Sequence, residues 1–340
     1  MNRRSGEKIV VLSTTFANSQ AAHALLAKAG FSVETVPRAQ GPERWLQIAR
    51  ALQGAAAVVV GHDHLDAAII AGARELKVIV KQGVGVDNID LPAATDKGVL
   101  VVNASGTNAE SVADLTFALI LAVARRLVFA HNLVASGGWT RLIGAEAWGK
   151  CLGVVGFGNI GQRVARRATG FSMNVAYYDV VAYPDIERDY PGLVRMELAE
   201  LLGWADFVSL HLPLISSTRD LVGERELSLM KPTAYLINTS RGGVVDEEAL
   251  YTALKEGTIA GAALDVFTQE PPLDRKVVQL PNVIATPHMG AYTVEANDRA
   301  CLHVAQSIVD ALENRLPKTT LNPEALAHRA ASGKQESELR

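Results

Sequence analysis

Three ionisable side chains, Arg241, Glu270 and His288, each follow a short apolar stretch in the second half of the chain. An imidazole titrates near neutral pH, so His288 can give a proton to a carbonyl oxygen or take one from an alcohol. A carboxylate such as Glu270 fixes the tautomer of a neighbouring imidazole. The planar guanidinium of Arg241 can bind a substrate carboxylate through two hydrogen bonds and polarise the adjacent carbonyl. Together they indicate proton transfer on a carboxylic acid that carries a carbonyl or alcohol.

Each of these residues also has an ordinary structural interpretation when it is considered alone. Arg241 precedes two glycines and is compatible with a surface turn, and Glu270 precedes two prolines and is compatible with a loop acid. His288 is compatible with a hydrogen-bonded core histidine, because such histidines and structural ion pairs are common. Only their meeting in one place favours the catalytic interpretation.

Residues 154–161 read Val-Val-Gly-Phe-Gly-Asn-Ile-Gly, the fingerprint of a dinucleotide-binding βαβ unit. Gly156 allows a tight turn from strand to helix, Gly158 lets a pyrophosphate approach the backbone, and Gly161 allows helix and strand to pack closely. The amides and the dipole of the following helix then face the anion. An apolar run before the turn and an amphipathic pattern after it supply the required context, so we predict a nucleotide site here.

An acid, Asp179, ends the next apolar run, 18 residues after Gly161. A carboxylate at this place accepts hydrogen bonds from a ribose diol and repels a 2′-phosphate. Val180 and Val181, rather than an arginine, come directly after it. The sequence therefore predicts NAD (NADH) as the cofactor, with NADP less favoured.

Apolar runs alternate with helical patterns along the chain, which is typical of parallel α/β sheets. The first hundred residues predict strands at 9–12, 32–36, 57–60, 78–80 and 100–102. A long helix is expected from Ala109 to Leu127 or beyond; it is apolar almost all round and is therefore buried or shared between two bodies. Further strands are expected at 152–155, 175–178, 207–210, 234–238, 261–265 and 283–285, before a last helix at 294–313.

Composition and charge exclude several classes of protein. The chain has 340 residues, 49% hydrophobic and 20% charged, as in an ordinary globular protein. The net charge of −3 argues against nucleic acid as a partner, and no apolar run is long enough to cross a membrane. Two cysteines, Cys151 and Cys301, do not suggest a disulfide framework, so we expect a cytoplasmic protein. We expect no metal ion.

Several ordered motifs between about Ala57 and Leu321 resemble those of the D-isomer-specific 2-hydroxyacid dehydrogenases, the family that includes phosphoglycerate, glyoxylate/hydroxypyruvate and D-lactate dehydrogenases. Besides the glycine turn, they are Gly83-Val-Gly-Val-Asp-Asn-Ile-Asp, Asn108-Ala-Glu-Ser-Val-Ala-Asp-Leu, His211-Leu-Pro-Leu, Asn238-Thr-Ser-Arg-Gly-Gly, Ala263-Leu-Asp-Val-Phe, Glu270-Pro and Pro287-His-Met-Gly-Ala. Ordered motifs of this length are highly specific. The first fifty residues carry little of the signal.

The resemblance implies two Rossmann-like, doubly wound parallel-sheet α/β domains with a cleft between them. A discontinuous substrate domain would comprise residues 1–103 and 293–322, and an NAD-binding domain would comprise residues 104–292. The polar stretch 323–340 is expected to be a disordered tail. The long helix that follows Asn108 would carry the contact of a homodimer.

The resemblance also implies roles for individual residues. Arg241 would bind and polarise a 2-oxo acid, and His288, paired with Glu270, would be the proton donor in its reduction. The amides of Val84 and Gly85 would hold the substrate carboxylate. The cofactor would be contacted at its pyrophosphate by Gly156, Gly158, Asn159, Ile160 and Gly161, at its adenosine ribose by Asp179, and around its nicotinamide by Thr239, Ser240, Asp265, Gly290 and Ala291.

The expected substrate follows from departures from the phosphoglycerate dehydrogenases. Those enzymes usually have an arginine after the strand that matches residues 58–60, where this chain reads Gly61-His-Asp-His. Lys81 does stand where they place a basic residue, and with His62 or His64 it would receive a second polar or anionic substituent. We expect glyoxylate or hydroxypyruvate. The alternatives are 3-phosphoglycerate, phosphite, or a non-catalytic NAD-sensing function on the same fold.

Overall fold

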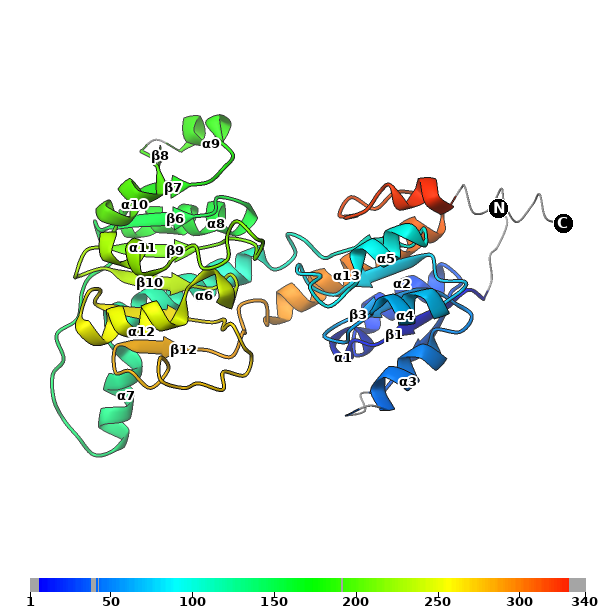
Figure 1. Cartoon of the computed structure of the whole chain (residues 1–340), viewed down its shortest axis with the longest axis horizontal. Coiled ribbons are helices and arrows are strands. Elements are labelled where there is room, and N and C mark those ends of the chain that lie inside the picture. Colours follow the sequence, from blue (N-terminus) through cyan, green and yellow to red (C-terminus); the bar gives the residue numbers. More distant parts are fainter. Residues whose placement is uncertain (1–5, 38–40, 42, 191, 330–340) are drawn as a thin grey trace. The chain divides into compact units, whose positions relative to one another are not determined.

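The computed structural model describes residues 6–37, 41, 43–190 and 192–329. The chain forms two compact units. Unit 1 is built from described residues up to Asn108 and from Val294 onward, and unit 2 runs from Ala109 to Thr293. Unit 1 is therefore discontinuous, with unit 2 inserted between its two segments (Figure 1).

Unit 1 contains a five-stranded sheet in which every neighbouring pair of strands is parallel, in the order β2-β1-β3-β4-β5. The strands are β1 (Lys8–Val11), β2 (Ser32–Thr35), β3 (Ala55–Val60), β4 (Val78–Lys81) and β5 (Leu100–Val102). The helices of this unit are α1 (Thr14–Ala17), α2 (Gln20–Lys28), α3 (Glu43–Ala51), α4 (Ala67–Gly72), α5 (Leu91–Asp96) and α13 (Val294–Leu312).

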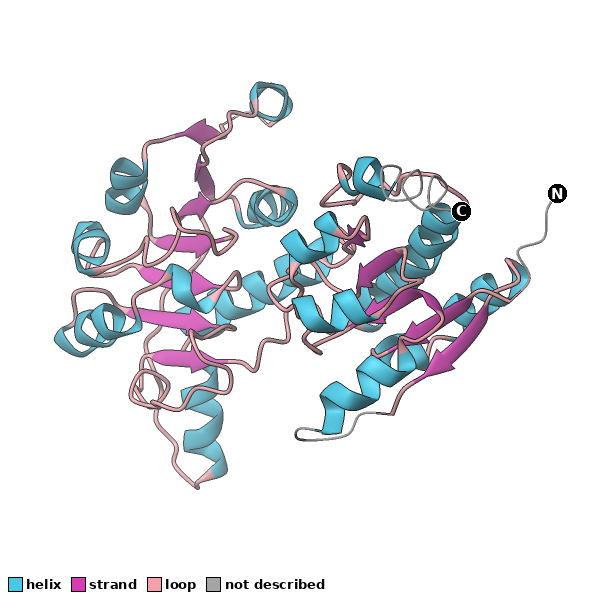
Figure 2. Cartoon of the chain, turned by 45° about the vertical axis from the view of Figure 1, so that its right-hand side comes forward, coloured by secondary structure: helices cyan, strands magenta, loops and turns pink. Residues whose placement is uncertain are grey.

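The strands of unit 1 are apolar on both faces because helices cover both. Ile9 and Val11 of β1 pack in a cluster with α2 and α13, whereas Val10 packs in a second cluster with α3, α4 and α5. Alternate side chains of a strand point to opposite faces, so a continuous apolar run is what a doubly covered sheet requires. Figure 2 shows helices on both sides of this sheet.

Unit 2 contains a seven-stranded parallel sheet in the order β12-β11-β10-β9-β6-β7-β8. The strands are β6 (Cys151–Val155), β7 (Asn174–Tyr178), β8 (Val194–Arg195), β9 (Phe207–Leu210), β10 (Tyr235–Asn238), β11 (Gly261–Leu264) and β12 (Val283–Ala285). The α-helices are α6 (Ala109–Ala124), α7 (Leu127–Ala135), α8 (Asn159–Ala168), α9 (Pro184–Asp189), α10 (Leu198–Trp204), α11 (Glu224–Leu229) and α12 (Glu247–Glu256).

The seven-stranded sheet is also covered on both faces. Helices α10, α11 and α12 pack on one face, where Val155 and Leu236 are buried, and α6 and α8 pack on the other face with Val154 and Ile237. The prediction of two doubly wound parallel-sheet α/β bodies is confirmed. The predicted strands are found within a few residues of their expected bounds.

The long apolar helix expected from Ala109 to Leu127 or beyond is wrong in its extent. Helix α6 ends at Ala124, Arg126 has a left-handed backbone with φ of 53°, and α7 begins at Leu127. A residue with a left-handed backbone does not continue a right-handed helix, so the helix is interrupted at Arg125 and Arg126. Helix α6 is buried as expected, but α7 has no buried residue.

The expectation of a disordered tail from residue 323 is wrong for its first part. Ala325 is fully buried in the core of unit 1. Arg329 donates from Nε to the carbonyl oxygen of Gly98 at 2.8 Å. The physical reason is that these residues bury apolar surface and satisfy backbone carbonyls, which their polar composition does not reveal. Residues 330–340 lie outside the described part of the chain.

None of the helices in the described part of the chain combines the length and the apolar character that crossing a bilayer requires.

Candidate active site

His288 and Glu270, which follow the carboxyl ends of β12 and β11 respectively, form a hydrogen-bonded pair. Nδ1 of His288 lies 2.8 Å from Oε2 of Glu270. The other carboxylate oxygen, Oε1, accepts a hydrogen bond of 3.2 Å from the backbone N–H of Phe267. The two side chains are 46% and 38% exposed, so a ligand can reach the ring. A carboxylate on Nδ1 fixes the tautomer and leaves Nε2 as the nitrogen that exchanges a proton.

Asp265, at the end of β11, anchors the loop that carries His288. Its backbone carbonyl accepts from the N–H of His288 at 2.8 Å. Its buried carboxylate accepts from Thr286 Oγ1 at 2.6 Å and from the N–H groups of Met289 and Gly290 at 2.9 Å each. These bonds hold His288 in a left-handed conformation with φ of 51°, which is uncommon for a residue with a side chain. Asp265 therefore positions the histidine, a role that the sequence did not indicate.

Arg241 follows β10 on a loop that the strand end holds in place. Asn238, the last residue of β10, donates from Nδ2 to the carbonyl oxygen of Arg241 at 2.9 Å. Nη1 of Arg241 donates to the carbonyl oxygen of Ser240 at 2.8 Å. The guanidinium is half-buried and thus retains surface through which it can meet an anion.

The loops after β10 and β11 pack against one another. A Cβ atom on Gly242 would lie only 1.9 Å from the carbonyl carbon of Phe267, so a glycine is required for this approach. Strands β10, β11 and β12 are adjacent and parallel. The structure therefore pairs Glu270 with His288 directly and places Arg241 on the neighbouring loop of the same sheet edge.

The residues expected around a nicotinamide lie on these same loops. Thr239 and Ser240 are buried, and their hydroxyls bond within the protein, Thr239 Oγ1 with Thr116 Oγ1 at 3.0 Å and Ser240 Oγ with Asn238 Oδ1 at 2.8 Å. Their side chains therefore shape the loop after β10. Of the three other expected residues, Asp265 follows β11, and Gly290 and Ala291 follow β12 just beyond His288.

The glycine turn after β6 has the geometry that its sequence predicts. Gly156 has φ of +90°, and a Cβ there would lie 2.5 Å from the carbonyl oxygen of His211. A Cβ on Gly161 would lie 2.2 Å from the carbonyl oxygen of Gly156, so helix α8 approaches the turn as closely as backbone allows. A Cβ on Gly158 would meet nothing within 4 Å, so this residue faces open space.

The start of α8 fits a bound pyrophosphate. Gly158 is the N-cap and supplies no side-chain hydrogen bond to the first turn, which begins at Asn159 and continues with Ile160. The first N–H groups of a helix lack partners within it and favour an anion. The open space at Gly158 and the uncapped helix start together provide the cradle that a dinucleotide needs.

Asp179, directly after β7, has a carboxylate held by backbone. Its Oδ2 accepts from the N–H of Phe157 at 2.6 Å and its Oδ1 accepts from the N–H of Val181 at 2.9 Å. The carboxylate is thereby fixed beside the glycine turn, with oxygen lone pairs remaining for a ribose diol. This arrangement fits the adenosine half of a dinucleotide.

His211 lies at the end of β9, against the glycine turn. Its Nε2 is 2.8 Å from Ser209 Oγ, while its buried Nδ1 has no hydrogen-bond partner among the described residues. Burial lowers the pKa of His211 to about 3, so the ring is neutral at ordinary pH. A neutral ring with a buried Nδ1 is compatible with a structural role for His211.

The residues expected to contact the substrate from the first half of the chain lie in unit 1, after β4. Lys81 Nζ donates to Gly61 O at 2.5 Å and to Asn88 Oδ1 at 2.7 Å. The carbonyl of Val84 accepts from Asn103 Nδ2 at 2.8 Å, and Gly85 follows it in the same loop. Lys81 therefore supports the loop after β3, a second role beside the predicted one.

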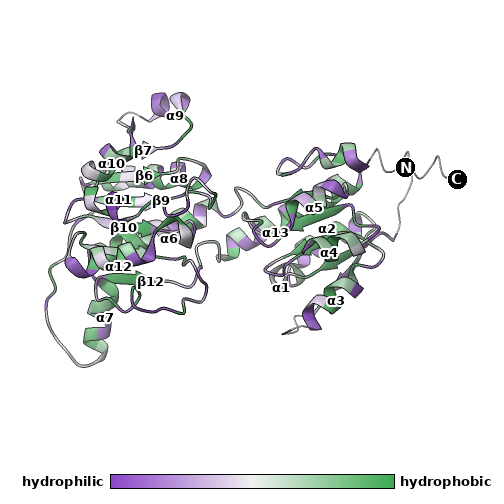
Figure 3. Ribbon diagram, in the orientation of Figure 1, coloured by the Kyte–Doolittle hydropathy of each residue, from purple (hydrophilic) through white to green (hydrophobic). Residues whose placement is uncertain are grey.

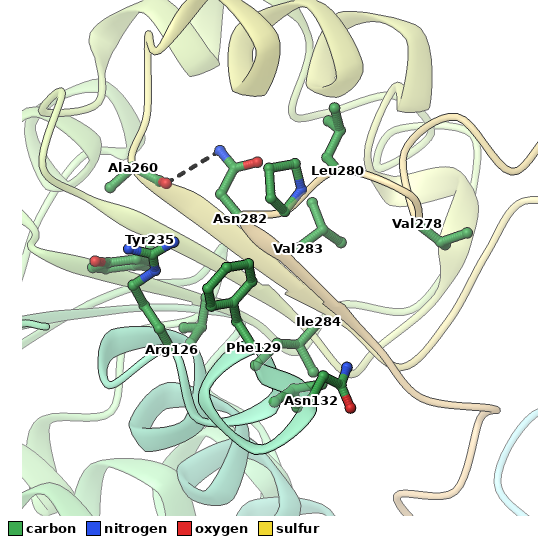
Figure 4. Close-up of a pocket in the computed structure, with 13 residues that line it drawn as sticks. Arg126, Phe129, Asn132, Tyr235, Ala260, Val278, Leu280, Asn282, Val283 and Ile284 are labelled. Atoms are coloured by element: carbon green, nitrogen blue, oxygen red, sulfur yellow. Dashed lines mark hydrogen bonds between the residues drawn. The ribbon is translucent and has the colours of Figure 1, made fainter. Parts of the chain in front are cut away.

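A cavity of about 280 Å³ lies at the opposite, amino edge of the seven-stranded sheet. Figure 4 shows Arg126, Phe129 and Asn132 of the α7 region on one side and Tyr235 and the start of β12 on the other. The guanidinium of Arg126 lies 4.9 Å from the centre of the Phe129 ring. None of the predicted site residues lines this cavity, so it is separate from the candidate active site.

The glycine turn after β6 suits a dinucleotide, and the pair of His288 and Glu270 after β12 and β11 suits acid–base chemistry. Together they define the class of the protein as an oxidoreductase. Residues 117–290 match the family model of the D-isomer specific 2-hydroxyacid dehydrogenase NAD-binding domain. The chain belongs to the D-isomer specific 2-hydroxyacid dehydrogenase family, as its motifs suggested. It is thus an oxidoreductase that acts on a CH–OH group with a nicotinamide cofactor.

Individual relatives agree with this assignment over most of the chain. A glyoxylate reductase of Thermococcus litoralis is 41% identical over 305 residues, which cover 87% of this chain and 92% of that protein. A D-3-phosphoglycerate dehydrogenase of Methanocaldococcus jannaschii is 46% identical over 260 residues, 75% of this chain and 49% of that protein. The crystal structure of the TT0316 protein from Thermus thermophilus superimposes with a TM-score of 0.83 at 36% identity, covering 92% of this chain and 99% of that chain.

Proposed function

We propose that this protein reduces a small 2-oxo acid, glyoxylate or hydroxypyruvate, reversibly to the corresponding 2-hydroxy acid with NADH, and to the D isomer where the product is chiral. The observation that carries the proposal is the 2.8 Å pair of His288 and Glu270 at the carboxyl edge of the sheet, beside the loop of Arg241. Ligands of open α/β sheets bind at this edge. Relatives at about this chain's length that are named glyoxylate reductase support the choice of substrate.

His288 is the proton donor in this proposal. Its Nε2 gives a proton to the oxygen at C2 during reduction and takes it back during oxidation. Glu270 holds Nδ1 and stabilises the positive charge that the ring carries before the transfer. Asp265 holds the loop in place, so the ring does not have to be ordered when substrate arrives. The bound nicotinamide supplies the hydride chemistry.

Arg241 is the proposed carboxylate ligand. Nη1 of its guanidinium donates to the carbonyl oxygen of Ser240 at 2.8 Å. A planar guanidinium binds a carboxylate through two parallel hydrogen bonds, which suits Arg241 to this role. In unit 1 we propose that Lys81 and the amides of Val84 and Gly85 contact an anionic group of the substrate. Two residues of the loop that Lys81 supports, His62 and His64, are the proposed determinants of substrate size.

We propose NAD rather than NADP as the cofactor. The fixed carboxylate of Asp179 is placed to accept from a ribose diol and carries the charge that repels a 2′-phosphate. The remaining contacts are those proposed for the pyrophosphate at residues 156–161 and for the nicotinamide at residues 239–240, 265 and 290–291. Unit 2 is accordingly the proposed NAD-binding domain and unit 1 the proposed substrate domain.

The proposed assembly is a homodimer formed through α7 and the segment after it. Helix α7 has no buried residue, although it is mostly apolar, and Figure 3 shows it as a green helix at the edge of its unit. In the following segment Trp139 and Ile143 are 86% and 92% exposed. Contiguous exposed apolar surface of this kind marks a protein interface. The free thiols of Cys151 and Cys301 support a reducing, cytoplasmic compartment for the dimer.

A panel of acids and both cofactors tests the function. The purified protein is expected to oxidise NADH fastest with glyoxylate or hydroxypyruvate. In the reverse direction it should consume D-glycerate, the chiral product of hydroxypyruvate, and not the L isomer. Faster turnover of 3-phosphohydroxypyruvate, or reduction of NAD by phosphite, would replace the proposed substrate. Tight NADH binding without turnover on any acid would refute the enzymatic proposal in favour of a NAD-sensing protein.

A further inference from the structure

A cation lies beside the acid that the sequence marks as the ribose ligand. Strand β8 pairs with β7, and Arg195 is the register partner of Tyr177, two residues before Asp179. Nη2 of Arg195 donates to the backbone carbonyl oxygen of Asp179 at 2.9 Å. Arg195 is 16 residues from Asp179 along the sequence and reaches it from the neighbouring strand.

The two opposite charges at this place are held very differently. The carboxylate of Asp179 is bound at both oxygens by the backbone N–H groups of Phe157 and Val181. Arg195 is exposed, and within the described residues it forms no salt bridge. A guanidinium has five N–H donors, so the single bond to a carbonyl leaves most of them for an anion.

We propose that Arg195 is a second residue that determines cofactor specificity, and that it binds the 2′-phosphate of NADP whenever the carboxylate of Asp179 is absent. This inference rests on the proposed dinucleotide site. A 2′-phosphate extends from the ribose oxygen that Asp179 addresses, so it lies within the reach of a flexible arginine whose guanidinium already touches that residue's backbone. Arginine binds phosphate through parallel hydrogen bonds, which suits it to this ligand.

The wild-type preference is then a balance between an acid and a base at one ribose. Asp179 disfavours the 2′-phosphate and accepts from the diol of NAD, while Arg195 attracts the phosphate. Removing the carboxylate therefore shifts the balance towards NADPH, and removing Arg195 as well takes that gain away. A merely structural Arg195, which only held the Asp179 carbonyl, would affect NADH and NADPH binding equally.

A four-protein cycle measures this difference directly. The dissociation constants of NADH and NADPH are measured by titration calorimetry at low ionic strength for the wild type, Asp179→Asn, Arg195→Gln and the double variant. Asparagine removes the charge and keeps an oxygen acceptor for one of the two backbone amides. In the Asp179→Asn protein the dissociation constant of NADPH should be lower than in the wild type by about tenfold or more. Adding Arg195→Gln should raise that dissociation constant again by about tenfold. NADH binding should change less than about twofold on adding Arg195→Gln.

The controls separate this inference from the proposed function. Arg166→Gln removes an exposed arginine from the far end of α8 and should leave the NADPH constant unchanged. Arg195→Lys in the Asn background should retain part of the NADPH affinity, because a point charge replaces the fork. Equal losses of NADH and NADPH on Arg195→Gln, or no loss of NADPH, overturn the inference. No binding of either dinucleotide to the wild type would instead overturn the proposed dinucleotide site.

Discussion

The two edges of the seven-stranded sheet are made by the same strands, yet they carry different kinds of residue. At the carboxyl edge, the charged side chains of Asp179, Asp265 and Glu270 each accept hydrogen bonds from backbone N–H groups. At the amino edge, the cavity is lined mostly by apolar and amide groups together with Arg126, and the apolar helix α7 beside it has no buried residue (Figures 1 and 4). At the carboxyl edge, backbone N–H groups hold the charged side chains in place. At the amino edge, helix α7 presents apolar surface that no described residue covers.

This difference separates chemistry from assembly within one unit. Side chains that act on a substrate must be held at fixed distances, and backbone amides at strand ends provide such support. Exposed apolar side chains gain free energy only when a second surface covers them. Substitutions at the carboxyl edge should therefore change rates and affinities, and substitutions at the amino edge should change the oligomeric state.

The largest effect is expected for His288→Asn. This change removes the proposed proton donor while the loop stays anchored by Asp265, so turnover of the 2-oxo acid should fall by about 10²- to 10⁴-fold. Steady-state kinetics measures the rate, and calorimetry should show unchanged NADH binding. A variant that keeps the wild-type rate would remove His288 from the mechanism, and simultaneous loss of NADH binding would indicate a damaged fold.

The next effect concerns the amino edge and the exposed face of α7. Phe129→Asp places a charge in the proposed dimer contact, so the dissociation constant of the dimer should rise by about thirtyfold or more. Light scattering after size-exclusion chromatography measures the mass. Leu302→Asp, at an exposed apolar position of α13 in unit 1, is the matched control and should leave the mass unchanged. A wild-type protein that is monomeric at all concentrations would refute the proposed dimer. A monomeric variant that no longer binds the dinucleotide would contradict the view that the amino edge serves assembly and the carboxyl edge serves chemistry.

How far the sequence predicted this structure depends on the range of the interaction. Both doubly wound sheets and the glycine turn follow from patterns a few residues long, such as an apolar run or the spacing of Gly156 and Gly161. The break at Arg126 was missed because apolar residues continue on both sides of it. A local pattern reports burial and periodicity, but it does not report one residue with a left-handed backbone.

The supports of the candidate site were hidden for a different reason. Asp265 acts through hydrogen bonds to residues 21 to 25 positions further along the chain. Arg195 acts through a hydrogen bond to Asp179, which follows the neighbouring strand β7. Such pairings depend on which strands become neighbours. The family resemblance predicts the pairing of Glu270 with His288. Considered alone, these two residues are also compatible with a loop acid and a hydrogen-bonded core histidine.

The third prediction compares two glycines of the same turn. Gly158→Ala introduces a methyl group into open space, so the free energy of unfolding should change by less than about 1 kcal/mol, while NADH affinity falls about tenfold or more. Gly161→Ala forces a Cβ to 2.2 Å from a carbonyl oxygen and should cost about 1–3 kcal/mol of stability. Urea unfolding and calorimetry measure the two quantities. Unchanged NADH affinity in the stable Gly158→Ala protein would move the pyrophosphate elsewhere.

The smallest effect is a pH dependence of stability that His211 contributes at the carboxyl edge. Because burial lowers the pKa of His211 to about 3, the native ring stays neutral while an unfolded histidine takes up a proton below about pH 6.5. The unfolded state therefore gains stability as the pH falls, and the free energy of unfolding should drop by about 1 kcal/mol between pH 6.5 and 5.5 from this group.

Urea titrations of the wild type and of His211→Asn at pH 7.5, 6.5 and 5.5 isolate that contribution by difference. Carboxylates contribute equally to both proteins and cancel. The difference in unfolding free energy should be constant between pH 7.5 and 6.5 apart from the onset of protonation, and should shrink below pH 6.5 as the wild type alone loses stability. Parallel curves for the two proteins over the whole range would mean that the His211 ring is protonated in the native state as readily as in the unfolded chain. The buried Nδ1 beside the glycine turn would then be accessible to water.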